Sequence, residues 1–169
     1  MERVGLAFVL ALAAAALVPA NASPGRGLRG LPIVGGHGAT AEASDASPGA
    51  RPVALTIRLH AELQCGRFDA TSIAVSLPSS MRVPGSLSRA AITVAGKAVI
   101  SVEVNGSRIV IHRAATKPGV TCDVIGPGVV TIRFARLAGL GNPPRPGSYS
   151  FTVVATPRGG TWRGVLSIR

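Results

Sequence analysis

The fold class of this chain is decided by the segment SVEVNGSRIVIH, Ser101–His112. Apolar and polar residues alternate in it on both sides of the pair Asn105-Gly106. Such a pair between two alternating stretches is typical of a β-hairpin closed by a type I′ turn, because Asn and Gly tolerate the positive φ angles that this turn needs. We therefore expect two antiparallel strands here. Their facing residues are predicted to be Val102 and Val104 on the first strand and Ile109 and Ile111 on the second.

The same two-residue period continues before and after the hairpin. In RPVALTIRLHA, residues 51–61, every second residue from Val53 to Leu59 is apolar, which is typical of a strand with one buried face. Comparable segments are 71–78, 91–99 (a second hairpin around Ala95-Gly96), 128–137, 148–155 and 161–169. The side chains expected to face inward on them include Ile73, Val75, Leu77, Val130, Ile132, Phe134, Tyr149, Phe151, Val153, Trp162, Leu166 and Ile168.

About eight short strands separated by Gly, Pro and Asn, with no helical period between them, predict one all-β domain over residues 52–169. A two-sheet β-sandwich is the preferred architecture. Within it, the run PPRP, Pro143–Pro146, is either a ligand for a groove that binds polyproline helices or a turn. We favour the turn, because proline donates no N–H to a sheet and Gly147 then leads into the strand that contains Tyr149.

The first 51 residues differ from the rest in composition and lack the two-residue period. A charged start, an apolar run from Val4 to Val18 and small residues before Ala22 predict a secretory signal peptide over residues 1–22, cleaved near Ala22. The apolar run is shorter than the roughly 20 residues of a spanning helix, so we expect no transmembrane span in the mature chain. Residues 23–51 are rich in Gly, Ala, Ser and Pro without a sustained period, which predicts a flexible arm. The protein is thus expected to be secreted or to lie in the cell envelope.

The order of these features resembles the immunoglobulin-like modules of bacterial secreted and cell-surface proteins, including those associated with surface layers. The resemblance rests on LPSSMRVPGSLSRAAITVAGKAV, on SVEVNGSRIVI and on GPGVVTIRFARLAGLGNPPRPGSYSFTVVAT, and it covers nearly all of residues 52–169. It implies an immunoglobulin-like β-sandwich with a non-enzymatic role. Two features depart from the family: the chain holds a single module, and it has a cysteine pair.

The chain is strongly basic, with a formal net charge of +11. A basic balance favours polyanionic partners such as nucleic acid, anionic lipid or acidic wall polymers. The arginines are scattered and aromatic residues are few, so a base-stacking platform for specific nucleic-acid binding is not expected. The arginines predicted to lie on solvent-facing sides of strands, and hence to contact a polyanion, are Arg58, Arg113, Arg133 and Arg163.

Two cysteines, Cys65 and Cys122, remain in the predicted mature chain. In an exported protein such a pair is predicted to form one disulfide, with two reduced, buried thiols as the alternative. His60 and Glu62 lie close to Cys65 in sequence and could hold a metal ion. A zinc site needs three or four convergent ligands, however, so the disulfide is the better explanation of Cys65.

Motifs for nucleophilic, zinc-dependent, phosphate-binding or calcium-binding sites are absent from the sequence. We therefore assign no catalytic, cofactor-binding or metal-binding residues and expect a non-enzymatic module that contacts acidic cell-envelope polymers. The first alternative is an accessory subunit that docks to a larger extracellular or periplasmic protein, for example through an exposed strand edge. An enzyme with a site assembled only by the fold is the third.

Overall fold

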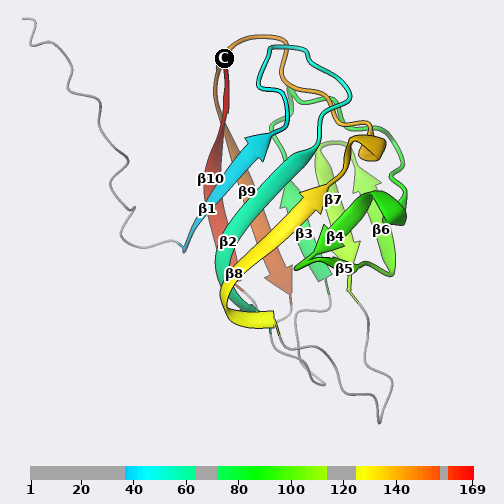
Figure 1. Cartoon of the computed structure of the whole chain (residues 1–169), viewed down its shortest axis with the longest axis vertical. Helices are drawn as coiled ribbons and strands as arrows, with labels where there is room; N and C mark the ends of the chain where they lie inside the picture. Colours follow the sequence, from blue (N-terminus) through cyan, green and yellow to red (C-terminus); the bar gives the residue numbers. More distant parts are fainter. Residues whose placement is uncertain (1–36, 64–71, 114–124, 157–159) are drawn as a thin grey trace, which may run out of the picture. The chain divides into compact units, whose positions relative to one another are not determined.

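Ten strands form one continuous, curled sheet in the computed structural model of this chain (Figure 1). The structure describes residues 37–63, 72–113, 125–156 and 160–169. The strands are β1 (His37–Ala43), β2 (Leu55–Leu63), β3 (Ser72–Ser76), β4 (Ile92–Val94), β5 (Lys97–Ala98), β6 (Ser101–Asn105), β7 (Arg108–His112), β8 (Ile125–Phe134), β9 (Gly147–Thr156) and β10 (Gly160–Ile168). Two short 3-10 helices, η1 (Arg89–Ala91) and η2 (Arg136–Ala138), precede β4 and follow β8.

The sheet order is β5-β4-β8-β2-β1-β10-β9-β3-β7-β6. The neighbours β1 and β10 are parallel, and the other neighbouring pairs are antiparallel. The predicted all-β class is confirmed. The sequence predicts a sandwich of two sheets with about eight strands in total. The structure instead has one sheet, in which all ten strands are hydrogen bonded to their neighbours without a break. Alternation along a strand shows which side chains face inward, but it carries no information about which strands pair.

The first strand corrects the predicted domain boundary. The sequence predicts a flexible arm over residues 23–51, yet β1 lies within this range and pairs with β2 on one side and with β10 on the other. Its inward residues are alanines, of which Ala39 is buried and Ala41 and Ala43 are partly buried. Such small side chains produce too weak a hydrophobic alternation to be recognised as a strand. The predicted signal peptide, residues 1–22, and residues 23–36 lie outside the described residues.

The hairpin β6–β7 has the predicted register but a different turn. Val102 faces Ile111 and Val104 faces Ile109, as expected. Asn105, however, is paired with Arg108, so the two loop residues are Gly106 and Ser107. A positive φ is found at Gly106 (59°) and not at Asn105 or Ser107. This pattern matches a type II′ turn rather than the predicted type I′.

The second predicted hairpin, β4–β5, contains the type I′ pattern instead. Its loop residues Ala95 and Gly96 have φ angles of 50° and 77°. Both hairpin positions were therefore predicted correctly, and only the turn type of the first was wrong.

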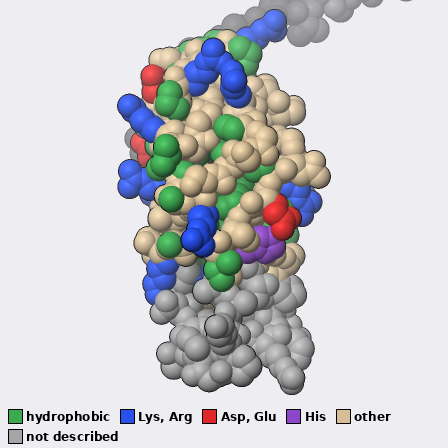
Figure 2. Space-filling view, turned by 90° about the vertical axis from the view of Figure 1, so that its right-hand side faces the viewer, with side chains coloured by type: hydrophobic (Ala, Val, Ile, Leu, Met, Phe, Trp, Pro, Cys, Tyr) green, Lys and Arg blue, Asp and Glu red, His purple; other side chains and the backbone are tan. Residues whose placement is uncertain are grey.

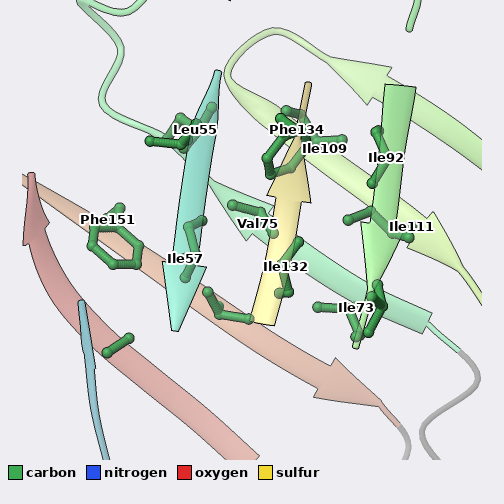
Figure 3. Packing of buried hydrophobic residues seen from close by; sticks show 14 of the residues in the cluster. Leu55, Ile57, Ile73, Val75, Ile92, Ile109, Ile111, Ile132, Phe134 and Phe151 are labelled. Carbon is green, nitrogen blue, oxygen red and sulfur yellow. The ribbon is translucent and has the colours of Figure 1, made fainter. Parts of the chain in front are cut away.

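The core lies inside the curl, where the two halves of the sheet face each other. Figure 3 shows residues of β2 and β8 directed towards the same interior as residues of β3 and β7. The predicted inward faces are confirmed, with Tyr149 only partly buried. Burying one large aliphatic or aromatic side chain contributes roughly 1.5–3 kcal/mol, so these faces hold the two halves together. The fully buried members include Leu55, Ile57, Ile109, Ile111, Ile132 and Phe134.

A set of connecting loops meets at the end of the sheet that is uppermost in Figure 1, and we call it the loop end: residues 44–54, 77–88 and 135–146. The side chain of Asn142 joins two of these loops by donating hydrogen bonds to the carbonyl oxygens of Asp45 (2.7 Å) and Ser47 (2.9 Å). The predicted turn Pro143–Pro146 lies here and leads into β9 at Gly147, as expected. The loops are thus tied into the fold.

Candidate anion-binding surface

Three of the four predicted arginines lie on one outward face of the sheet. Arg58 on β2 and Arg133 on β8 are both exposed, and the partner of Arg133 across the strand pair is Thr56. Arg163 on β10 is also exposed and faces Gly38 of β1. The fourth, Arg113, follows the end of β7, which is separated from β2 by several strands in the sheet order. The fold therefore brings together three of these side chains and not the fourth.

Arg58 and Arg133 line a shallow hollow of about 410 Å³ on the outward face of β1, β2 and β8, which we call the strand hollow. The alternation of the strands explains its composition, because residues two apart in sequence project from the same face. The hollow combines two guanidinium groups with hydroxyl groups and one carboxylate. Its polar lining residues are Glu42, Ser44, Thr56, Arg58, Thr131 and Arg133.

The two arginines of the strand hollow differ in their partners. Arg58 Nη1 lies 3.3 Å from Glu42 Oε2, and the two side chains are 50% and 71% exposed. An ion pair this open to solvent contributes less than about 1 kcal/mol, so a competing anion can displace Glu42. Within the described part of the chain, the Arg133 side chain makes no hydrogen bond or ion pair, and its partners in the register are Thr93 and Thr56. Arg133 is thus available to a ligand.

The residues considered for a metal ion do not converge. His60 and Glu62 are both exposed on β2. In the portions of the chain that the structure describes, no group of three or more His, Cys, Asp or Glu residues could hold a metal ion. Cys65 and Cys122, and with them the predicted disulfide, lie outside the described residues.

A second hollow lies at the loop end, and the sequence did not predict it. We call it the loop hollow. It has a volume of about 470 Å³ and is lined by Arg51, Pro52, Arg82, Pro84 and Gly139. Figure 2 shows Lys or Arg side chains at the upper end of the molecule, where the loops of Figure 1 meet, and at several other places on the same face. These residues come from three separate loops, so no local pattern in the sequence marks them as a group.

The loop end also contains an acidic residue, Asp45. Its carboxylate accepts a hydrogen bond from the Ser47 backbone N–H at 2.9 Å. That bond, a further one from the Ser47 side chain and the nearby charge of Arg136 hold the pKa of Asp45 below its usual value, against a smaller opposing effect of desolvation. Asp45 is therefore a carboxylate at neutral pH, which accepts hydrogen bonds from Ser47 and is attracted to the charge of Arg136.

No helix in the described segments has both the length and the apolar character of a membrane-spanning one. No family model matches the chain, and no curated protein matches its sequence.

The solved structures that resemble this one include the following three, each of which matches 78% of this chain. BslA, a bacterial hydrophobin, has 14% identity and a TM-score of 0.46, and 98% of its chain is covered. The N-terminal domain of the Streptococcus gordonii adhesin Sgo0707 has 9% identity and a TM-score of 0.44, with 32% of that chain covered. A structure that contains manganese lipoxygenase of Gaeumannomyces graminis and part of zonadhesin of Komagataella pastoris has 17% identity and a TM-score of 0.38, with 45% covered. Likeness at this level carries no information about activity.

Proposed function

We propose that this protein is an exported, non-enzymatic module that binds acidic polymers of the cell envelope through the strand hollow. The observation that carries the proposal is the exposed guanidinium of Arg133, which has no partner in the described part of the chain and stands beside the weakly paired Arg58. Guanidinium groups bind carboxylate and phosphate groups in a planar, two-point geometry. The threonine hydroxyls around them can bind the remaining oxygens of such a ligand.

The overall charge of the chain supports the same partner class. A formal net charge of +11 attracts polyanions over a distance of about 10 Å at moderate salt. Arg163 extends the positive face beyond the strand hollow, across β1 onto β10. A linear polymer could therefore follow this face over several strands.

The predicted export and the predicted family are part of this proposal. The signal peptide would deliver the module outside the cytoplasm, where wall and envelope polymers lie. The immunoglobulin-like interpretation is supported by the pairing of β1 with both β2 and β10 and by the packing of two sheet halves on one core. Such a module needs only a rigid face that carries the binding side chains.

The test is retention of the purified protein on isolated cell walls at increasing salt concentration. We expect retention to fall as salt rises, because exposed charge contacts are screened. The double variant R58Q/R133Q should bind about tenfold more weakly, since two exposed charge contacts contribute somewhat less than about 1 kcal/mol each. The matched control is R108Q, which removes an exposed arginine from β7 instead. Retention that is insensitive to salt, or an equal loss in both variants, would show that the strand hollow is not the site.

One observation favours the alternative of an accessory subunit. β6 lies at the end of the strand order, so one of its edges has no strand neighbour among the described residues. An exposed edge can pair with an extended segment of another protein. A stable partner that co-purifies with the native protein and protects the β6 amides from hydrogen exchange would favour this function over polymer binding.

A further inference from the structure

The loop hollow holds two positive side chains next to each other. Its arginines, Arg51 and Arg82, belong to different loops, yet both approach Gly141 closely. A Cβ atom added to Gly141 would lie 3.2 Å from the Cβ of Arg51 and 3.3 Å from the Cβ of Arg82. Both arginine side chains therefore begin close to the same glycine, and a larger residue at this position would require them to shift by a few tenths of an ångström.

Backbone hydrogen bonds fix this arrangement. The N–H groups of Arg82 and Gly141 donate to each other's carbonyl oxygens at 3.0 Å. The N–H of Asn142 donates to the Ala50 oxygen, also at 3.0 Å, and the N–H of Val53 donates to the Leu140 oxygen at 2.9 Å. The loop that carries Arg51 and the loop that carries Arg82 are both bonded to the same segment, residues 140–142. The hollow is thus organised before any ligand arrives.

Two positive side chains that line one hollow repel each other, and an anion bound between them would offset this repulsion. Within the described segments, neither the Arg51 nor the Arg82 side chain makes a hydrogen bond or ion pair. Three of the described carboxylates already have a partner: Glu42 pairs with Arg58, Glu103 contacts His112, and Asp45 accepts a hydrogen bond from Ser47. Among the described residues, two arginines and no carboxylate line the loop hollow.

We propose that the loop hollow is a binding site for a single phosphate group, held between Arg51 and Arg82. A phosphate presents three or four oxygens in a tetrahedral array, so two guanidinium groups can each donate a pair of hydrogen bonds to a different edge of it. A carboxylate has two oxygens, which one fork already satisfies. Pro52 and Pro84 form rigid walls beside the two arginines, so the ligand is a group that fits between them. This site is separate from the strand hollow and does not depend on the function proposed for it.

The test is a titration of the full mature chain with inorganic phosphate at constant ionic strength. Binding is monitored through the NMR signals of the backbone amides and the arginine side chains. We expect saturable shifts at residues 50–53, 82–84 and 139–142, and much weaker binding of acetate. The variants R51Q and R82Q should each weaken phosphate binding at least tenfold, because each loses a charge-assisted contact. The matched control is R145Q, which removes an arginine from the same loop end without altering the lining of the hollow.

A third variant separates geometry from charge. G141A keeps both arginines but requires their stems to shift, so we expect its phosphate affinity to fall while its net charge is unchanged. Circular dichroism of the variants verifies that the fold is retained. An equal loss in R145Q, equal affinities for phosphate and acetate, or undiminished binding in G141A would overturn the proposal.

Two further probes identify the source of the phosphate group. Chains of poly(glycerol phosphate) and vesicles containing phosphatidylglycerol both present phosphodiesters, the first in solution and the second at a surface. If a probe competes with inorganic phosphate and R51Q/R82Q abolishes this competition, that probe binds at the loop hollow. If neither probe competes with inorganic phosphate, the ligand is not a phosphodiester. Phosphate binding at the loop hollow is read from the shifts of residues 50–53, 82–84 and 139–142, whereas the strand hollow is tested by wall retention of R58Q/R133Q, so the two tests fail independently.

Discussion

The strand hollow and the loop hollow are both lined by arginines, but different physical causes place those arginines. Arg58 and Arg133 share a face because they lie on adjacent paired strands, where alternation and register set the direction of every side chain. Arg51 and Arg82 are neighbours because two loops are hydrogen bonded to the same third segment. Charges on strands can therefore be anticipated from a local pattern, whereas charges on loops are brought together only by the complete fold.

The comparison also concerns stability. The strand hollow rests on sheet pairing over the main core, and its outward residues can change at little cost. The loop hollow rests on a few polar contacts around Asn142, which is only 4% exposed. The amide nitrogen of Asn142 makes two hydrogen bonds, while its side-chain oxygen has no partner in the described part of the chain. The loop end should therefore respond far more to single substitutions.

The largest expected effect on the free energy of unfolding is the loss of the predicted disulfide, which should destabilise both regions equally. β2 and β8 remain paired as far as Leu63 and Ile125, which lie two and three residues from Cys65 and Cys122 in sequence. We predict that these cysteines form a disulfide, whose loss lowers the free energy of unfolding by roughly 4 kcal/mol for a loop of about 57 residues. Denaturant unfolding with and without reductant measures this difference. Alkylation of two free thiols in the native, unreduced protein would contradict the prediction.

The next effect should distinguish the two regions. The substitution Asn142→Asp keeps the shape of the side chain but places a buried carboxylate against the carbonyl oxygens of Asp45 and Ser47. We expect a loss of about 3 kcal/mol or more in the free energy of unfolding, as for other uncompensated buried charges. Hydrogen exchange should become faster at the loop end and change little at the strand hollow.

The matched control for this experiment is Asn142→Ala. It removes both hydrogen bonds without introducing a charge, and it should cost about 1–3 kcal/mol. If the aspartate variant is no less stable than the alanine variant, then the contacts of Asn142 do not hold the loops in the way described.

The smallest effect concerns pH. Because the hydrogen bonds from Ser47 and the charge of Arg136 lower the pKa of Asp45, its stabilising contribution is present above the unfolded value of about 3.8 and is lost as pH falls through the lower folded value. We expect the NMR titration midpoint of the Asp45 carboxyl to lie below 3.8. It should rise towards that value in Arg136→Gln and remain unchanged in R133Q. A midpoint at or above 3.8 in the unmodified protein would contradict this account of the loop end.

Much of the fold could be predicted from particular residues. The alternating run from Val53 to Leu59 and the Val102/Val104 hairpin gave correct inward faces, because side-chain direction in a strand follows local sequence. β1 was missed, because its inward alanines bury little apolar surface. The shift of the turn to Gly106 and Ser107 was missed because the register of the two strands, which pairs Asn105 with Arg108, is not marked by the local sequence.

The candidate sites divide in the same way. The sequence by itself determined that Arg58, Arg133 and Arg163 point outward, because each lies one residue away from a buried apolar neighbour on its strand. Only the tertiary structure decided that Arg113 lies apart from them and that Arg51 and Arg82 both lie close to Gly141. The physical reason is the range of the interactions involved: alternation acts between adjacent residues, whereas the meeting of three loops depends on the order in which all the strands pair.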